Sequence, residues 1–463
     1  MTHYHLIGIG GTGLSAIARV LFERGETVTG SDMAASPGSE ELMQIGIKVF
    51  IGHEKHNIDG AETVIRSSAI QDSNPEVIAA LEAGIPVLKR RDFLSELTGK
   101  QKVIAVAGTH GKTTTTAMIA WCLKSSGFDP SFVIGSNSKN LESNAAYGKG
   151  DYFVIEADEY DNMFLGLEPD ILVVTNIEHD HPDCFPTKDA YLNAFTQLLK
   201  NVKSDGYLIA CQDNEGVRDL LCECNHAVTC ITYGTREKSD LQIKSIHYAQ
   251  DAGILFSVQD NTQKLLPASY EQLSLQLPGE HNALNATAAL AVAALIHADF
   301  SKIRNALSVF SGTGRRFDII GQVNGITIID DYGHHPTEIK ATLAGARSLF
   351  AGKKIWTVWQ PHTYSRTQEL FGEFCDAFSD SDHVIVTEIY KSREQEQDYS
   401  SELVVIAMEH PDKYFLPQLQ DAVDFLKDHL ASGDVLIVFS AGDANQITKS
   451  VLQYFQENGR END

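Results

Sequence analysis

The stretch GTHGKT, at residues 108–113, has the residue types of a phosphate-binding loop. Its two glycines allow backbone N–H groups to converge on phosphate oxygens, Lys112 can reach the β- and γ-phosphates, and the Thr113 hydroxyl can ligate Mg²⁺. The common spacing G-x-x-x-x-G-K-[ST] would place the first glycine where Val106 stands, so this loop is shorter than usual. The sequence therefore indicates a nucleoside triphosphate site, and the alternative is an ordinary turn between a strand and a helix.

Acidic and imidazole side chains follow the next two strand-like runs. The run FVIE ends at Glu156 within EADEYD, and LVVTNIE leads to His181 within EHDHPD. Because ligands of an open parallel sheet gather at the carboxyl ends of its strands, we expect both residues to lie beside the loop at 108–113. We predict that Thr113, Glu156 and His181 hold Mg²⁺ at the triphosphate. Taken singly, Glu156 and His181 could equally be a surface acid and a hydrogen-bonded histidine.

A second glycine loop, Gly8-x-Gly10-x-x-Gly13, follows the first strand-like run and opens a helical pattern, and Asp32 ends the next strand-like run. This is the dinucleotide-binding fingerprint, in which glycines permit close backbone approach and the helix N-terminus attracts a pyrophosphate. The chemistry selects a nucleotide diphosphate without selecting nicotinamide. A dehydrogenase would leave the loop at 108–113 unexplained, and the remaining alternative is a structural turn.

Strand-like and helical stretches alternate along all 463 residues, which indicates α/β units with mostly parallel sheets. We predict three domains: a Rossmann-like N-terminal domain at 1–99, a central P-loop ATPase domain with a mostly parallel sheet at 100–314, and a Rossmann-like C-terminal domain at 315–463. A more alternating region at 231–277 is typical of hairpins. The polar run at 394–401 is expected to be a surface loop.

The charge balance argues against some classes of partner. The chain has 37 Lys and Arg against 62 Asp and Glu, a net charge of −25, so nucleic acid is not an expected partner. Any anionic substrate must be held by locally concentrated donors. No run approaches 18 continuous apolar residues, so we expect no membrane span. The first residues lack the basic region and cleavage site of a secretory signal, so we expect a cytoplasmic protein.

Seven scattered cysteines indicate reduced thiols, which also fits the cytoplasm. Cys222, Cys224, His226 and Cys230 form the pattern C-x-C-x-H-x3-C, which faintly resembles a zinc site. Zinc sites usually draw on two separated pairs of ligands, and Cys230 falls in an alternating strand-like run. We therefore assign no zinc to these residues.

Six motifs in one order resemble the Mur ligases. They are GTHGKTTT, EADEYD, TNIEHDHPD, PGEHNALNATAA, GTGRRF and DDYGHHPTE, and the resemblance extends from Gly8 to Gly442. In that family the phosphate loop has the short form GT(H/N)GKT, so the missing glycine is a family trait. His110, where several sister ligases carry asparagine, favours the alanine-adding branch or the related tripeptide-recycling branch.

The resemblance implies roles for residues at the matching positions. The UDP part of a sugar nucleotide would contact Gly10, Gly11, Thr12, Gly13, Asp32, Ser67 and Ser68. ATP would contact Gly108, Thr109, His110, Gly111, Lys112, Thr113 and Thr114, with His281, Asn282 and Asn285 near the adenine. Arg315 and Asp331 would complete the nucleotide site from the third domain. Catalytic roles would fall to Lys112, Arg316, His334, His335 and Arg366.

Several of these assignments have a simpler alternative. In the family an arginine at the hinge reaches the transferring phosphate, but an Arg-Arg pair is also common in a solvated linker. The two histidines and Arg366 would position the amino acid and the muramyl carboxylate, yet adjacent histidines before Pro336 could form a structural turn. Residues 281–285 could likewise be an ordinary helix N-terminus. Many relatives carry arginine where Thr363 stands, so Arg366 would act alone on the acceptor carboxylate.

The resemblance implies an ADP-forming ligase that uses ATP and Mg²⁺ to join L-alanine to the lactyl carboxylate of UDP-N-acetylmuramate, through an acyl phosphate. Its partners would be these small molecules, with no nucleic acid and no membrane, and the chain would be a monomer or a weak homodimer. Alternatives are the tripeptide-recycling muramate ligase, an NAD-dependent dehydrogenase, and a nucleotide sensor without turnover.

Overall fold

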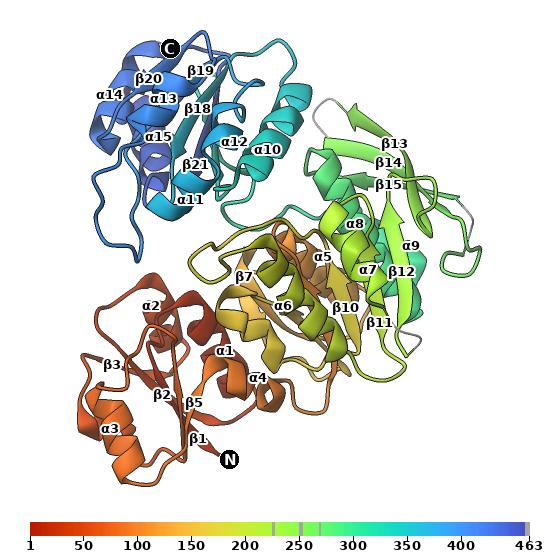
Figure 1. The fold of residues 1–463 in the computed structure, drawn as a ribbon, viewed down its shortest axis with the longest axis vertical. Coiled ribbons are helices and arrows are strands. Elements are labelled where there is room, and N and C mark those ends of the chain that lie inside the picture. Colours follow the sequence, from red (N-terminus) through yellow and green to blue (C-terminus); the bar gives the residue numbers. More distant parts are fainter. Residues whose placement is uncertain (225–226, 250–252, 268–269, 459–463) are drawn as a thin grey trace.

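The computed structural model describes residues 1–463 apart from 225–226, 250–252, 268–269 and 459–463. Three sheets organise these residues, with five, ten and six strands. The predicted α/β class with mostly parallel sheets is confirmed (Figure 1).

The first sheet has the strand order β3-β2-β1-β4-β5, and all its pairings are parallel. Its strands are β1 (His3–Ile7), β2 (Thr27–Asp32), β3 (Lys48–Ile51), β4 (Thr63–Arg66) and β5 (Val87–Lys89). Its helices are α1 (Thr12–Glu23), α2 (Pro37–Gln44), η1 (Lys55–Ile58, a 3-10 helix), α3 (Pro75–Glu82) and α4 (Arg90–Thr98). The glycine loop at 8–13 therefore connects the central strand β1 to α1, as a Rossmann-like fold requires.

The second sheet has the order β15-β14-β13-β12-β11-β10-β6-β9-β7-β8. Its strands are β6 (Lys102–Ala107), β7 (Ser131–Ser138), β8 (Ser143–Ala146), β9 (Tyr152–Glu156), β10 (Ile171–Val174), β11 (Tyr207–Cys211), β12 (Thr229–Gly234), β13 (Leu241–Ala249), β14 (Gly253–Asp260) and β15 (Tyr270–Leu275). Its helices are α5 (Lys112–Ser125), η2 (Tyr160–Gly166), α6 (Lys188–Lys200), α7 (Glu215–Cys222), α8 (Glu280–Leu295) and α9 (Phe300–Ser308).

The hairpin prediction for residues 231–277 is right for β13, β14 and β15, which pair antiparallel, whereas β12 pairs parallel with β11. Side chains of β6 alternate between two cores. Ile104 and Val106 pack with α5 and α8, and Ala105 and Ala107 belong to the core that also contains residues of α1, α4 and α6. The core that contains Ala105 and Ala107 includes residues of both the first and the second sheet. Apolar packing therefore holds the N-terminal domain against the central domain.

The third sheet has the order β16-β17-β21-β18-β19-β20, antiparallel only between β16 and β17. Its strands are β16 (Asp318–Val323), β17 (Ile326–Asp331), β18 (Ile355–Gln360), β19 (His383–Val386), β20 (Lys413–Phe415) and β21 (Val435–Ser440). Its helices are α10 (Pro336–Leu349), α11 (Tyr364–Glu369), α12 (Phe371–Cys375), α13 (Glu402–Ala407), α14 (Leu419–His429) and α15 (Asn445–Asn458).

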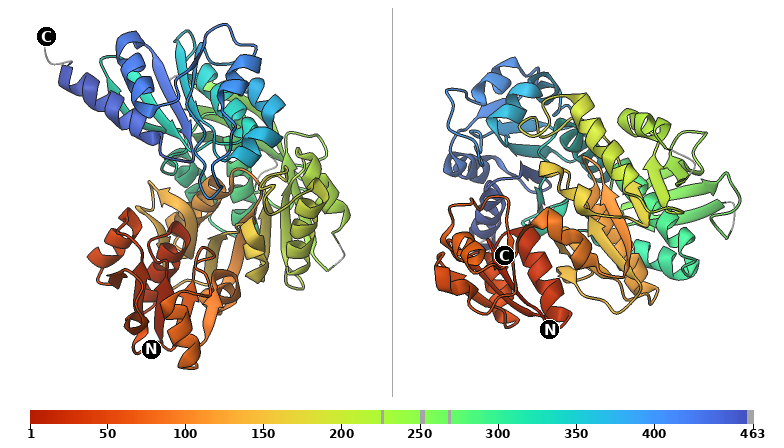
Figure 2. Two further views of the ribbon diagram at one scale, coloured as in Figure 1. Left: turned by 60° about the vertical axis from the view of Figure 1, so that its left-hand side comes forward. Right: turned by 60° about the horizontal axis from the view of Figure 1, so that its bottom comes forward.

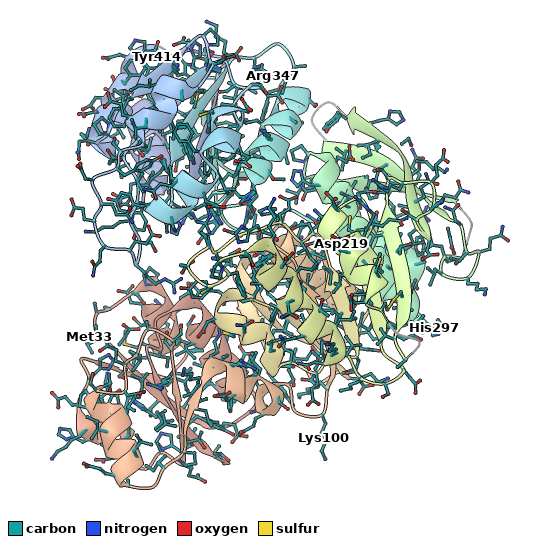
Figure 3. All side chains as sticks on the ribbon, in the orientation of Figure 1. Met33, Lys100, Asp219, His297, Arg347 and Tyr414 are labelled. Atoms are coloured by element: carbon teal, nitrogen blue, oxygen red, sulfur yellow. A yellow bond between two sulfur atoms is a disulfide. The ribbon has the colours of Figure 1, made fainter. Side chains whose placement is uncertain are left out.

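The central domain lies between its two neighbours. In Figure 2 the first domain and the C-terminal domain each lie beside the central domain, and in the right-hand view both lie on the same side of it. Helix α1 packs on β7 and β8, and α10 packs on α8. Side chains occupy the space between the central and C-terminal ribbons (Figure 3), and the Lys139 ammonium lies 2.7 Å from the Asp318 carboxylate across this boundary. Within the described chain, no helix combines the length and apolar character that crossing a membrane requires.

The expectation that all cysteines are reduced is wrong for one pair. Cys224, just after α7, and Cys230 of β12 form a disulfide. Cys222 is free and exposed. His226, the histidine of the zinc-like pattern, lies outside the described residues.

Candidate active site

The phosphate loop is shaped by two glycines in backbone conformations that other residues rarely adopt. Gly108 has φ +140° and Gly111 has φ +78°. A Cβ atom on Gly108 would collide with the Thr175 hydroxyl, and one on Gly111 would lie 2.8 Å from the Asn285 side-chain oxygen. The loop therefore needs glycine both for its turn and for its neighbours, and it delivers the chain into α5 at Lys112.

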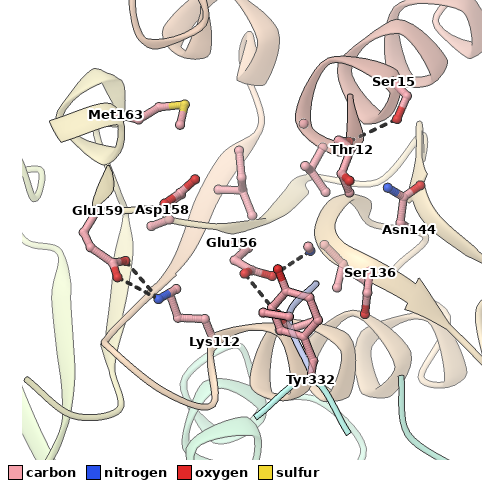
Figure 4. Close-up of a pocket in the computed structure, with 18 of the residues that line it drawn as sticks. Thr12, Ser15, Lys112, Ser136, Asn144, Glu156, Asp158, Glu159, Met163 and Tyr332 are labelled. Atoms are coloured by element: carbon pink, nitrogen blue, oxygen red, sulfur yellow. Dashed lines mark hydrogen bonds and ion pairs between the residues drawn. The ribbon is translucent and has the colours of Figure 1, made fainter. Parts of the chain in front are cut away.

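Lys112 is held by carboxylate and carbonyl oxygens. Its Nζ lies 2.9 Å from Glu159 Oε2 (Figure 4) and donates to the Gly108 carbonyl at 2.5 Å. Burial acts to lower the pKa of Lys112, but the Glu159 and Glu156 carboxylates outweigh it and raise that pKa above its usual value. Burial likewise opposes ionisation of Glu159, yet Lys112 and His181 lower the Glu159 pKa to about 2. Lys112 is therefore a fixed cation at the mouth of the loop.

Glu156 and Thr113 offer the oxygen ligands that Mg²⁺ prefers. Thr113 Oγ1 lies 3.0 Å from Glu156 Oε1, and the Gly135 N–H donates to Glu156 Oε2 at 2.6 Å. Burial raises the Glu156 pKa, and Lys112 partly offsets this effect. A half-buried carboxylate beside a hydroxyl is a donor set that fits a divalent cation with phosphate oxygens as its other ligands. His181 lines the same cavity, but its Nε2 lies 3.6 Å from Glu159.

The structure brings together a different group that could hold a metal. His110, Glu178 and His335 place ligand atoms within 4.8 Å of one another. Burial acts to lower the pKa of His110, but Glu338 and Glu178 raise it to about 9. His110 Nδ1 lies 3.4 Å from Glu338 and its Nε2 3.4 Å from Glu178. A protonated His110 therefore neutralises these carboxylates without requiring a metal ion.

The first glycine loop is braced by the acid that ends β2. Gly10 N–H donates to Asp32 Oδ2 at 2.8 Å, so Asp32 holds the loop from behind. A Cβ atom on Gly13 would collide with the Arg90 guanidinium, which lies 3.1 Å from Asp158 of the central domain. The loop thus opens toward the second domain.

A cavity of about 320 Å³ lies behind the phosphate loop, between the central and C-terminal domains. Burial lowers the pKa of His281 to about 4, so this ring is neutral near pH 7 and can accept a hydrogen bond. Asn282 and Asn285 are buried beside it. Burial raises the pKa of Asp331 to about 6, although the Phe317 and Gly333 N–H groups donate to its carboxylate. Asn and neutral His side chains suit the edge of an adenine ring.

Two arginines follow the link into the C-terminal domain. Arg315 Nε lies 3.2 Å from Asp330, and Arg316 Nη1 lies 2.9 Å from Glu338 at the start of α10. Because Glu338 also faces His110, Arg316 and the phosphate loop share one carboxylate across the domain boundary. The arginine pair is therefore built into the site and is not a solvated linker.

The adjacent histidines have separate positions. His334 Nδ1 lies 3.0 Å from the Tyr332 carbonyl, which places the neutral ring's proton on Nδ1 and leaves Nε2 as an acceptor. Burial, reinforced by Arg366, holds the His334 pKa well below its usual value. His335 accepts from Thr337 N–H and caps α10, with its ring centroid 4.5 Å from that of His110.

Arg366 forms an ion pair with a residue of the central domain. Its Nη2 lies 2.8 Å from Asp180 Oδ1, and the side chains are only 5% and 4% exposed. Its Nη1 lies 3.1 Å from His362 Nδ1. Thr363 has φ +69° and accepts from the Arg366 N–H to start α11. Arg366 therefore joins two domains and has few donors left for a substrate.

Most of the expected site residues line one connected region. A cavity of about 850 Å³ is lined by Gly10, Thr12, Gly13, Thr109, Gly111, Lys112, Thr113, Glu156, His181, Arg315, Arg316, His334 and Arg366. The 320 Å³ cavity is lined by His110, Gly111, Thr113, Thr114, His281, Asn282, Asn285, Arg316 and Asp331. A cavity of about 510 Å³ beside the first domain is lined by Gly11, Thr12, Gly13, Ser67 and Ser68. Three expected residues line none of these cavities: Asp32, Gly108 and His335. Each contacts a loop or helix that does line a cavity, as described above.

Several residues of this region were not expected from the sequence. They are Arg90, Glu159, Glu178, Asp180, Glu338, His362 and Arg393. Four of them lie inside the motifs quoted above: Glu159, Glu178, Asp180 and Glu338. Their place in a motif was the only sequence feature that could have indicated a role at the site. Arg393 had none, because it lies in no quoted motif and directly precedes the polar run at 394–401 that was predicted as a surface loop.

A phosphate loop and a dinucleotide-type loop that share one cavity, closed by a third α/β domain, define an enzyme that handles two nucleotides together. Three family descriptions match this chain: "Mur ligase family, catalytic domain" at residues 3–102, "Mur ligase middle domain" at 106–293, and "Mur ligase, glutamate ligase domain" at 315–442. The chain belongs to the Mur ligase family.

Named relatives agree with this assignment. The chain is 41% identical over 462 residues to a UDP-N-acetylmuramate--L-alanine ligase of Desulforamulus reducens, covering 98% of each chain. The solved UDP-N-acetylmuramate-alanine ligase of Thermotoga maritima is 29% identical, with a TM-score of 0.81 over 99% of this chain and 100% of that one. A murein peptide ligase of Psychrobacter arcticus is 27% identical, with a TM-score of 0.70 over 98% and 99% of the two chains.

Proposed function

We propose that this chain joins L-alanine to the lactyl carboxylate of UDP-N-acetylmuramate and converts ATP to ADP and phosphate. It is an ATP-dependent ligase that forms an amide bond between an acid and an amino acid, and the product is a peptidoglycan precursor. A cytoplasmic location is part of the proposal.

One observation carries the mechanism: the two nucleotide loops open into a single cavity. Gly10 and Gly13 of the first loop and Gly111 and Lys112 of the second line the same space of about 850 Å³, which is within the usual range for ligand pockets. A sugar nucleotide held at the first loop can therefore point its lactyl acid toward the γ-phosphate of ATP held at the second.

The first step transfers the γ-phosphoryl group to the lactyl carboxylate. A carboxylate oxygen bonds to phosphorus, the bond to the β–γ bridging oxygen breaks, and ADP leaves. Lys112 neutralises the oxygens of the transferring group, and Arg316 is placed to do so from the third domain. Thr113 and Glu156 would hold Mg²⁺, which supplies further charge neutralisation when bound.

The second step forms the amide. The L-alanine amine attacks the acyl carbon, the carbon–oxygen bond to phosphate breaks, and the departing phosphate takes the proton that the nitrogen loses as it becomes an amide. Alanine arrives as an ammonium ion and must first lose a proton. His334 is neutral near pH 7 and keeps Nε2 as an acceptor, so it is our candidate for that proton. No nucleophilic side chain is required, since positioning and charge neutralisation supply the catalysis.

The test is a coupled ADP-release assay with UDP-N-acetylmuramate fixed and the acceptor varied. We expect turnover that requires both the sugar nucleotide and L-alanine. Release dependent on the tripeptide L-alanyl-γ-D-glutamyl-meso-diaminopimelate and not on L-alanine would replace the proposal with the recycling ligase. Reduction of NAD in the absence of ATP would point instead to a dehydrogenase, which none of the relatives named above suggests.

A further inference from the structure

Six cationic side chains line the 850 Å³ cavity, and five of them face a carboxylate within 3.2 Å. The five are Arg90, Lys112, Arg315, Arg316 and Arg366. The sixth, Arg393, has no carboxylate partner among the described residues. In a chain with a net charge of −25, an unpaired guanidinium in a substrate cavity is a site for an anionic group.

Arg393 faces an aromatic ring of another domain. Its guanidinium carbon lies 4.4 Å from the ring centroid of Tyr160, which belongs to the central domain. The Tyr160 hydroxyl donates to Asp183 at 2.9 Å, and its ring lies edge-on to that of His181. A contact between a cation and a ring face orients the guanidinium and leaves its N–H donors free.

The backbone around Arg393 is fixed to the start of α11. Thr363 N–H donates to the Tyr390 carbonyl at 2.9 Å. The carboxylate of Glu394 accepts from the Tyr364 N–H at 2.5 Å and also from Ser365. Glu394 is therefore a cap for α11, not simply part of a polar surface loop. These bonds bring Arg393 beside Thr363.

The neighbouring wall of the cavity is the one expected to receive the amino acid. The ring centroids of His334 and His362 are 5.9 Å apart, and His362 stacks on Tyr390 at 5.8 Å. Arg366, the cation first expected to hold the acceptor carboxylate, is occupied by Asp180. The carboxylate of an amino acid does not react in this chemistry, so it keeps its negative charge and needs a cation at this wall.

We infer that Arg393 binds the α-carboxylate of the incoming amino acid and so selects a free amino acid over a blocked one. The inference rests on the proposed function. Arg393 supplies the guanidinium that position 363 lacks, from a loop instead of from the helix start.

The experiment compares wild type with Arg393→Gln in the ADP-release assay, using L-alanine and L-alaninamide. Loss of a charge-assisted pair should raise the KM for L-alanine by roughly 10- to 100-fold. The KM values for ATP and UDP-N-acetylmuramate should stay unchanged. Wild type should strongly prefer L-alanine to L-alaninamide, and the variant should lose most of that preference. The reason is that the amide in the substrate and the Arg393→Gln substitution each remove the same ion pair.

Lys391→Gln is the matched control. It removes a positive charge two residues away, from an exposed side chain that pairs with Glu396 at 3.6 Å and does not line the cavity. Its KM for L-alanine should equal that of wild type. Adding Thr363→Arg to Arg393→Gln should recover part of the preference for L-alanine, since it returns a guanidinium to the same wall.

The outcomes separate the two proposals. If wild type turns over and Arg393→Gln keeps its preference for L-alanine over the amide, the inference is wrong and the proposed function stands. A rise confined to the KM for UDP-N-acetylmuramate would also overturn it, by assigning Arg393 to the sugar nucleotide. If wild type releases no ADP with both substrates present, the proposed function fails and the inference falls with it.

Discussion

At the scale of single residues, neighbouring carboxylates keep Lys112 of the phosphate loop protonated. Glu159 lies within 3.1 Å of Lys112 and also faces His181, and Glu156 faces Thr113. These acids keep the Lys112 pKa raised despite burial, so the lysine is charged at any pH at which the enzyme would work. When ATP binds, its phosphate oxygens replace these carboxylates as the anionic partners of Lys112. The lysine therefore has an anionic partner both with and without ATP, and is never a buried, unpaired charge.

Lys112→Ala should lower acceptor-dependent ADP release by at least about 100-fold, because a fixed charge that stabilises the transferring phosphoryl group is lost. The measurement is kcat with saturating UDP-N-acetylmuramate and L-alanine. Lys100→Ala is the control, since this exposed lysine projects from the surface away from the cavity (Figure 3). Near-normal turnover in Lys112→Ala would end the assignment of residues 108–113 as the phosphate loop.

Residue types with local signatures could be predicted from the sequence, and their partners could not. Glycine, lysine and threonine in a fixed spacing indicate a phosphate loop because each type has one physical task there. Nothing local shows that Arg366 pairs with Asp180, 186 residues earlier, or that Arg393 has no carboxylate partner in the part of the chain that the structure describes. The roles given to the site residues remain predictions.

Glycines decide the geometry at the scale of elements. Gly111 is the residue before α5 and lies in the left-handed region, and its neighbour Asn285 comes from the second turn of α8. The two helices therefore approach each other at the position where a nucleotide would pass from the phosphate loop to the 320 Å³ cavity. A side chain at position 111 would push this junction apart.

Gly111→Ala should weaken ATP binding by roughly 10-fold or more, because alanine is strained at φ +78° and its Cβ would crowd Asn285. Gly127→Ala is the matched control, with φ +90° and no atom within 4 Å of its added Cβ. Both variants carry the backbone strain of about 1–2 kcal/mol, and only the first adds the collision. Equal nucleotide affinity of the two variants by calorimetry would contradict the role of this contact.

Elements with a distinct local pattern were predictable. The continuous apolar runs of β6, β9 and β10 indicate strands buried on both faces. Helix α5 follows from its place after the phosphate loop, because it is buried on nearly every side and shows no apolar stripe. The order of ten strands in the central sheet does not follow, because pairing between distant strands depends on packing. The Cys224–Cys230 disulfide was missed for a similar reason, since the spacing of cysteines alone does not specify which of them pair.

Charged side chains connect the central and C-terminal domains at the scale of the whole molecule. Asp180 pairs with Arg366, Lys139 with Asp318, and His110 lies between Glu178 and Glu338. Thr337 also donates to Glu178 at 2.8 Å. Because His110 belongs to the phosphate loop and Glu338 to α10, the charge on this imidazole links the nucleotide site to closure of the third domain. No local sequence pattern indicates this link, because the partners are in different motifs.

His110→Asn should remove a pH-dependent part of the stability. The pKa of His110 is raised from its usual 6.5 to about 9, so the folded protein holds the proton more tightly than the unfolded chain does. The stabilisation is complete below about pH 6.5 and is lost as the pH rises through about 9. Glu178, Glu338 and the neighbouring His335 are the titratable groups that face this ring.

The measurement is the difference in melting temperature between wild type and His110→Asn from pH 6 to pH 9.5. We expect wild type to melt higher at pH 6 and the difference to shrink steadily toward pH 9.5. His297→Asn is the control, because this exposed histidine forms no ion pair in the described part of the chain and lies at the outer edge of the central domain (Figure 3). A difference for His110→Asn that is constant across the range would mean that the imidazole contributes through shape alone, and the charge would then have no part in holding the third domain to the phosphate loop.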